Sequence, residues 1–197
     1  MSAPRDAPLD GSRGPHARRS RLERGAAGVR VAVGLGSNLG DRRAHLVRGV
    51  EGLGEAVSLE ALSSTYESDA VGFESQPPFL NAILVGTTEL GPEELLARAR
   101  RVETEAGRKR SFRNAPRTLD LDLILYGGLT LVGPDLHVPH PRFRDRAFVL
   151  APLVEVAPAW VDPVSGRTVL EIWDERRESL PPARVVAPPP LPPRSQP

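Results

Sequence analysis

Apolar residues alternate with small or polar residues over 29–35, a period of two that predicts a first β-strand. The segment 36–40, which contains glycine and asparagine, ends that strand in a turn. Over 41–53 the apolar positions recur every three or four residues, which predicts a helix with one buried face. The folded part of the chain therefore begins with a strand, a tight turn and a helix.

Two further strands and a second helix follow. Residues 57–66 alternate weakly and predict a second strand, and 80–88 predict a third after a loop of Gly, Ser and Pro at 72–78. Residues 92–106 predict a helix, because a proline opens it, two glutamates follow in its first turn and its apolar residues form a stripe. Gly107 then ends this helix.

A fourth strand completes the pattern. The polar segment 108–117 leads into 118–126, whose alternation and apolar content predict a strand packed on at least one face. The order β-α-β-β-α-β predicts an α+β, ferredoxin-like fold, an antiparallel sheet with two helices on one face. C-terminal helices are predicted at 147–156 and 168–177, and Pro152 favours a break or kink in the first of them.

Both ends of the chain differ in composition from its middle. Residues 1–28 are rich in Arg, Gly and Pro, and 179–197 are rich in Pro. Such segments bury too little apolar surface to offset the entropy of ordering the chain. We therefore expect a single domain at 29–178 between a disordered leader and a disordered tail.

Overall composition narrows the classes of function. The 197 residues include no Cys, which excludes a disulfide framework and a thiolate metal site, so a metal would be held by carboxylates, imidazoles or phosphates. A formal net charge of +1 argues against nucleic-acid binding through overall charge. The sequence shows neither a signal peptide nor an apolar run long enough to span a membrane. We expect a soluble, cytoplasmic monomer that binds small molecules rather than nucleic acid or membranes.

Two carboxylates in the fourth predicted strand are candidates for metal binding. Asp120 and Asp122 are two apart, so their side chains leave the same face of the sheet while Leu121 packs on the other. Carboxylate oxygens held this close suit Mg²⁺, with phosphates and water completing its coordination. A pair of solvent-facing acids is the alternative, and for an isolated pair it would be the better interpretation.

Basic residues near this pair favour the metal-phosphate interpretation. The ten-residue segment 108–117, just before Asp120, contains a cluster of basic side chains: Arg108, Lys109, Arg110, Arg113 and Arg117. His140 is followed closely by Arg142, Arg144 and Arg146. Guanidinium groups neutralise and orient polyphosphates, although a solvated basic loop and a nucleic-acid contact remain alternatives. Against the latter, Phe112 is the single residue of this segment able to stack on a base.

Four segments carry a resemblance to a known family: VGLGSNLGDR at 33–42, PFLNA at 78–82, PRTLDLDLILYG at 116–127 and VPHPRFRDRAFVLAPLVEVAP at 138–158. In this order and spacing the chain resembles the 6-hydroxymethyl-7,8-dihydropterin pyrophosphokinases of folate biosynthesis from residue 29 to 158. The resemblance implies the ferredoxin-like fold inferred above. It also implies transfer of pyrophosphate from ATP to the hydroxymethyl group of the pterin, with release of AMP.

The resemblance also implies roles for individual residues. Asp120 and Asp122 would bind two Mg²⁺ ions that bridge the ATP phosphates, and together with Arg108 and Arg110 they would be the catalytic residues. Arg108 and Arg110 would lie on a loop that closes over ATP. The implied ATP-binding residues are Arg100, Glu103, Arg108, Arg110, Arg117, His140 and Arg146.

The implied pterin site combines aromatic and amide groups. Asn81 would bond to the pterin edge, and Phe79 and Phe148 would sandwich its ring. The full set of implied pterin-binding residues is Ser68, Val71, Gly72, Phe79, Asn81 and Phe148.

Two positions depart from the family pattern. Asn114 replaces a tryptophan that some members carry in the loop, and Arg100 replaces a frequent glutamine near the nucleotide. Two other functions stay open on residues alone. One is a different Mg²⁺-dependent nucleotide transferase, and the other is a non-catalytic ferredoxin-like module that binds a ligand or RNA.

Overall fold

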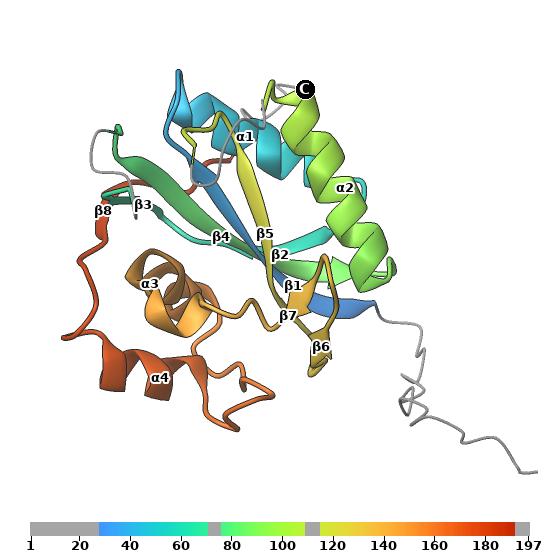
Figure 1. Cartoon of the computed structure of the whole chain (residues 1–197), viewed down its shortest axis with the longest axis vertical. Helices are drawn as coiled ribbons and strands as arrows, with labels where there is room; N and C mark the ends of the chain where they lie inside the picture. The colour runs from blue at the N-terminus through green and yellow to red at the C-terminus, as the bar shows by residue number, and fades with distance from the viewer. Residues whose placement is uncertain (1–27, 71–75, 109–114, 192–197) are drawn as a thin grey trace, which may run out of the picture.

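An antiparallel sheet forms the centre of the molecule (Figure 1). The computed structural model describes residues 28–70, 76–108 and 115–191. In the main sheet, β1 (Val29–Ser37) lies between β5 (Asp120–Tyr126) and β4 (Phe79–Thr88), and the strand order is β5-β1-β4-β3-β8 with β2 also on β4. The structure has the order β-α-β-β-α-β when the short strands β2 (Ser58–Leu62) and β3 (Thr65–Ser68) are counted as one, and with the antiparallel pairing this confirms the predicted α+β, ferredoxin-like sheet.

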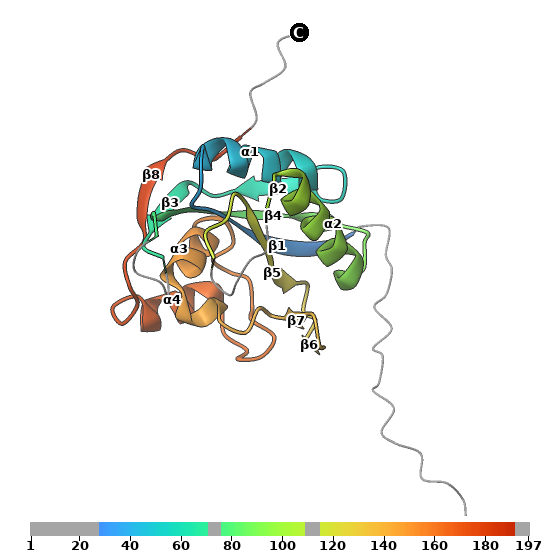
Figure 2. The ribbon, with the colours of Figure 1, turned by 45° about the horizontal axis from the view of Figure 1, so that its top comes forward.

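Helices cover both faces of this sheet (Figure 2). Helices α1 (Arg42–Leu53) and α2 (Pro92–Glu105) pack on one face, as predicted. The C-terminal helices α3 (Ala147–Val156) and α4 (Val169–Arg176) pack on the opposite face. The sheet is therefore the middle layer of three, and each face has its own apolar cluster.

The side chains of β1 show how these two layers are specified. Val31, Val33 and Leu35 point into the cluster with α1 and α2, whereas Ala32 points into the cluster with α3 and α4. Gly34 and Gly36 continue the Ala32 face without side chains, a consequence of the two-residue period of a strand. The central strand therefore leaves open space on the α3 side of the sheet.

The predicted second strand is two short strands. Both β2 (Ser58–Leu62) and β3 (Thr65–Ser68) pair with β4. Between them the Ser63 backbone N–H donates to the Ile83 carbonyl oxygen at 2.9 Å, and the Ser63 hydroxyl oxygen accepts from the Ile83 N–H, also at 2.9 Å. The serine side chain thus replaces a backbone acceptor at the break, which a single alternating pattern does not predict.

The C-terminal segment also differs from its prediction. Arg184–Ala187 form strand β8, which pairs antiparallel with β3, so the prediction of disorder from residue 179 is wrong for these residues. The edge of β3 offers backbone hydrogen-bond partners to these residues, and this pairing allows them to form a strand. Of the predicted leader at 1–28, residues 1–27 lie outside the described residues.

Of the break or kink predicted at Pro152, the break is wrong, because helix α3 continues through Pro152 to Val156. A proline removes one backbone donor, and Pro152 is buried within the helix. Smaller elements connect β5 to α3: the hairpin of β6 (Leu131–Val132) and β7 (His137–Val138), and the short helix η1 (Phe143–Asp145). In the described part of the chain, no helix has the length and apolar character needed to cross a membrane.

Candidate active site

A cavity of about 240 Å³ opens on the α3 side of the sheet, above β1, β4 and β5. Its lining brings together most of the residues proposed from the sequence: Ser68, Phe79, Asn81, Arg108, Arg117, Asp120, Asp122, His140, Arg146 and Phe148. These residues come from strands, from the loop before β5 and from the start of α3. Segments far apart in the chain therefore contribute to one concave surface.

Strand register aligns the centre of this cavity. Gly36 lies opposite Asn81 of β4 on one side and opposite Asp120 of β5 on the other. A Cβ atom at Gly36 would lie 3.4 Å from Asn81 Oδ1 and 3.7 Å from both Asp120 Cβ and Phe79 Cδ1. Because Gly36 has no side chain, its backbone forms the floor of the cavity between the Asp120 carboxylate and the Asn81 amide.

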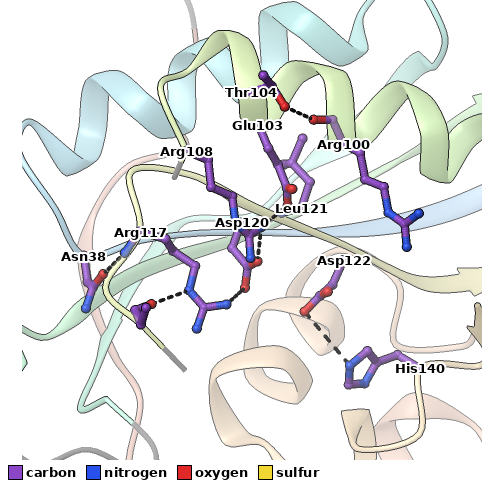
Figure 3. Close-up of polar contacts among 11 residues, drawn as sticks. Asn38, Arg100, Glu103, Thr104, Arg108, Arg117, Asp120, Leu121, Asp122 and His140 are labelled. Atoms are coloured by element: carbon purple, nitrogen blue, oxygen red, sulfur yellow. Dashed lines mark hydrogen bonds and ion pairs between the residues drawn. The ribbon is translucent and has the colours of Figure 1, made fainter. Parts of the chain in front are cut away.

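The carboxylate half of the cavity comprises Asp120, Asp122, Arg108, Arg117 and His140 (Figure 3). Arg108 Nη1 donates to Asp120 Oδ1 at 2.6 Å, and Arg117 Nη1 donates to Asp120 Oδ2 at 2.9 Å. Both arginine side chains are largely buried. Two guanidinium groups therefore compensate the charge of Asp120.

Glu103 supports this half from behind the strand. Its side chain is buried, its Oε1 accepts the Leu121 backbone N–H at 2.8 Å, and it also forms an ion pair with Arg108. Glu103 does not line the cavity. Its contacts position Arg108 and the strand segment between the two aspartates.

Asp122 has different charged neighbours from Asp120. In the described part of the chain its one partner within ion-pair distance is His140, whose Nε2 lies 4.0 Å from Asp122 Oδ2. Burial within the concave site, followed by repulsion from the Asp120 charge, raises the pKa of Asp122 to about 6. The ionised Asp122 carboxylate is therefore short of positive charge and suited to a cation.

His140 presents a neutral donor to the cavity. Its Nδ1 accepts the Arg142 backbone N–H at 3.2 Å, which places the ring proton on Nε2, the nitrogen that faces Asp122. Burial, and then the positive charges of Arg146 and Arg142, lower the pKa of His140 to about 4. At neutral pH the imidazole can donate a hydrogen bond without carrying charge.

The aromatic half of the cavity comprises Phe79, Asn81, Ser68 and Phe148. Asn81 is buried, and its Nδ2 donates to the Ser68 hydroxyl oxygen at 3.1 Å. The Arg117 guanidinium carbon lies 5.7 Å from the centre of the Phe79 ring, and the Arg146 carbon lies 5.4 Å from that of Phe148. Rings and a directed amide group suit a flat polar heterocycle.

Some residues proposed from the sequence do not reach the cavity or cannot be placed. Arg100 is exposed on α2 and lines neither the main cavity nor the smaller hollow described below. Its carbonyl oxygen accepts from the Thr104 hydroxyl. Arg110, Val71 and Gly72 lie outside the described residues.

Sequence reasoning did not identify Asn38, which joins three segments around the site. It is almost fully buried, its Oδ1 accepts the Arg117 backbone N–H at 2.8 Å, and its Nδ2 donates to the Pro77 carbonyl oxygen at 3.2 Å. The signal was its place in the turn after the first strand, where Asn often bonds to nearby backbone. Asn38 positions both Arg117 and the entry to β4.

A second hollow of about 200 Å³ adjoins the carboxylate half and was also not predicted. It shares Asp122 and His140 with the main cavity. Its remaining lining is Leu96, Leu123, Pro134, Asp135, Leu136, His137 and Pro141. The two hollows meet at Asp122.

Within 28–70, 76–108 and 115–191, no group of three or more His, Asp or Glu side chains is placed to hold a metal alone. Asp120 and Asp122 therefore provide an incomplete oxygen set. Such a set fits a cation whose remaining ligands come from a bound polyphosphate and water.

Comparisons with known proteins agree on one family. Residues 32–158 match the model of the 7,8-dihydro-6-hydroxymethylpterin-pyrophosphokinase (HPPK) family. The 2-amino-4-hydroxy-6-hydroxymethyldihydropteridine pyrophosphokinase of Aquifex aeolicus (strain VF5) is 41% identical over 145 residues, which cover 74% of this chain and 91% of that protein. The protein of the same name from Bacillus subtilis (strain 168) is 45% identical over 126 residues, which cover 63% and 75%.

A solved structure supports the fold. The wild-type HPPK-DHPS of Plasmodium falciparum superposes with a TM-score of 0.60 at 12% identity, over 77% of this chain and 46% of that one. The chain thus spans less than half of this longer protein.

Proposed function

Because this chain belongs to the 7,8-dihydro-6-hydroxymethylpterin-pyrophosphokinase family, we propose that the cavity above β1, β4 and β5 is its active site. The enzyme transfers the pyrophosphoryl group of ATP to the hydroxymethyl group of a dihydropterin in folate synthesis. One observation supports the assignment of the cavity above all: Asp120 and Asp122 share it with Asn81, Phe79 and Phe148.

The pterin occupies the aromatic half. Phe79 and Phe148 contact the two faces of its ring, and Asn81, oriented by Ser68, bonds to its polar edge. The open floor at Gly36 directs the hydroxymethyl arm toward Asp120, since Gly36 lies between Asn81 and Asp120 across the sheet. This arrangement fits a substrate whose flat ring lies on one side of Gly36 and whose reacting hydroxyl group lies on the other.

Asp120 and Asp122 are the ligands of two Mg²⁺ ions in this proposal. Their hard oxygen atoms fit that cation, and Asp122 in particular lacks a charged partner in the described structure. Magnesium held here would supply positive charge that compensates the phosphate oxygens. Arg108 and Arg117, which bond to Asp120 in this structure, would be placed to contact the same phosphate oxygens.

The triphosphate lies across the carboxylate half. Arg108, Arg117 and Arg146 supply positive charge, and neutral His140 donates through Nε2. Beyond Asp122 the second hollow, with Leu96 and Leu123 in its lining, accommodates the nucleoside. Roles for Arg100 and Arg110 in ATP binding stay proposals from family resemblance, as do contacts of the pterin with Val71 and Gly72.

The chemistry is an in-line displacement. The pterin hydroxymethyl oxygen attacks the β-phosphorus of ATP, the bond from that phosphorus to the α–β bridging oxygen breaks, AMP leaves with that oxygen, and the hydroxyl proton is lost to solvent. Catalysis rests on orientation and charge compensation rather than on a covalent intermediate.

The location of the protein, its oligomeric state and its class of ligand complete the proposal. We expect a cytoplasmic protein, in keeping with the absence of Cys. A monomer is supported by the scatter of exposed large apolar residues over several elements of the described structure. Nucleic acid is not expected as a ligand, because the formal net charge of the chain is only +1.

An assay of AMP formation tests the function and its acceptor. The enzyme with Mg²⁺ and ATP should release AMP in amounts equal to the pterin diphosphate formed, and release should require hydroxymethyldihydropterin. Release of AMP at the same rate without the pterin would indicate another acceptor and contradict the assignment of the aromatic half.

A further inference from the structure

The chain beyond the family match returns to the edge of the sheet beside β3. Strand β8, drawn in red in Figure 1, pairs with β3 so that Ala187 lies opposite Thr65 and Val185 opposite Tyr66. The family match ends at residue 158, so this strand lies outside it. We call residues 184–190 the C-terminal strap.

Helix α1 anchors the strap after the strand ends. Arg43 Nη1 donates to the Pro188 carbonyl oxygen at 3.0 Å, and Arg43 Nη2 donates to that of Pro189 at 3.1 Å. The Thr65 hydroxyl also donates to the Pro188 carbonyl oxygen at 3.0 Å, and Pro190 is buried. Prolines have no backbone N–H, yet their carbonyl oxygens remain acceptors, so one guanidinium group can hold two of them.

The strand that the strap covers carries part of the aromatic half. Strand β3 has four residues and ends at Ser68, whose hydroxyl oxygen accepts from Asn81. Across three neighbouring strands, Val185 of β8 lies opposite Tyr66 of β3, which lies opposite Asn81 of β4. Without β8, β3 would be a short edge strand, which is weakly held.

We propose that the C-terminal strap is a positioning element of the pterin site: by holding β3 against β4, it keeps Ser68 and Asn81 in their binding geometry. The inference rests on the proposed function of the aromatic half. It predicts a selective effect, because the carboxylate half is built from β5, the loop before it and residues 140–146, none of which pairs with the strap.

A purely structural role would have a different kinetic signature. Loss of general stability would lower the amount of active enzyme and leave both KM values unchanged. Loss of positioning would raise the KM for the pterin and leave the KM for ATP unchanged.

The test uses the full chain with Arg43→Gln, and Arg48→Gln as a matched control that removes an exposed charge from the same helix. Steady-state kinetics would measure each KM at saturating concentration of the other substrate. Hydrogen exchange would measure the protection of the β3 and β5 amides. We expect Arg43→Gln to raise the pterin KM roughly three- to tenfold, since it removes two charge-assisted hydrogen bonds to the strap and a longer one, of 3.4 Å, to the Thr65 hydroxyl oxygen of β3. The ATP KM and kcat should stay within about twofold of the control, and exchange should quicken at 65–68 and not in β5.

An unchanged pterin KM, or an equal rise in both KM values, would overturn the proposal even if the wild-type enzyme is active. Unchanged exchange at 65–68 would also overturn it, because Arg43 would then not hold the strap. Failure of the wild-type enzyme to form AMP with the pterin would instead contradict the proposed function.

Discussion

The carboxylate half and the aromatic half of the cavity are stabilised by different interactions. Charged side chains hold the first: Asp120 accepts from Arg108 and Arg117, and Glu103 holds Arg108 from behind. The second depends on strand register, on a neutral hydrogen bond from Asn81 to Ser68 and on the absence of a side chain at Gly36.

This difference separates two kinds of sensitivity. In the carboxylate half, removal of one charge leaves its partners uncompensated, and in the proposed mechanism it would alter the energy of the reacting phosphates. In the aromatic half, a small change in volume alters binding of a ring while the charges are unaffected. Substitutions in the two halves should therefore separate kcat from the KM of the pterin.

The largest effect is expected from Asp122→Asn. The amide cannot supply an anionic metal ligand, so kcat should fall by at least about a thousandfold. Quench-flow measurement of AMP formation at saturating Mg²⁺ would check this, with Asp174→Asn, an exposed position on α4, as the control. Wild-type turnover by Asp122→Asn would remove the carboxylate half from the mechanism.

Arg108→Ala should have the next largest effect. Its guanidinium is held by Asp120 and Glu103 until phosphate is bound, so we expect single-turnover rates to fall about a hundredfold. The Kd for ATP should change by less than about fivefold, because other guanidinium groups remain. Arg101→Ala, an exposed position on α2, is the control. A raised Kd for ATP with an unchanged single-turnover rate at saturating ATP would show that Arg108 acts in binding alone.

Gly36→Ala addresses the aromatic half. The added methyl group fits without a severe clash but occupies the floor between Asn81 and Asp120. The KM for the pterin should rise roughly tenfold while the KM for ATP changes little. Gly128→Ala, where nothing lies within 4 Å of the new atom, controls for glycine replacement itself. Equal pterin KM values for Gly36→Ala and Gly128→Ala would mean that the bound pterin does not lie over Gly36.

The smallest expected effect concerns stability and pH. The pKa of Asp122 rises from 3.8 to about 6 on folding, so its ionisation opposes folding. Below pH 3.8 the carboxyl group is neutral in both states and costs nothing. Between 3.8 and about 6 it ionises first in the unfolded chain, stability falls as pH rises, and above about 6 the full cost is present.

Without Mg²⁺, Asp122→Asn should therefore stabilise the fold at pH 8 and not near pH 3.5. The Asp122 side chain is 44% exposed, so solvent screening reduces the gain to about 1 kcal/mol. Urea unfolding in EDTA at both pH values would measure it. A variant that is no more stable than wild type at pH 8 would contradict the charge deficit at Asp122.

Local patterns were sufficient for much of the fold. The two-residue period placed Asp120 and Asp122 on one face and Leu121 on the other, because alternation is a property of any extended strand. Apolar stripes and end signals located α1 and α2 within one or two residues. Here the local signal and the tertiary packing agree.

Features that depend on partners distant in the sequence were not predictable in the same way. The alignment of Gly36 with Asn81 and Asp120 requires the register of three strands. Strand β8 has proline-rich surroundings that indicate disorder, and it forms because β3 offers a free edge. The neutral state of His140 results from burial and from Arg146, which periodicity does not reveal. The grouping of Phe79, Asn81 and Phe148 with the carboxylates was inferred from family resemblance rather than from pattern.

The glycine at position 36 limits how this cavity can change through mutation. Hydrogen is the smallest substituent an amino acid can carry, so every replacement there narrows the space. Accommodation of a bulkier acceptor would have to come from the walls, at Ser68 or Phe148, where side chains can be shortened. Mutation can therefore only narrow the cavity at its base, whereas at its walls mutation can either narrow or widen it.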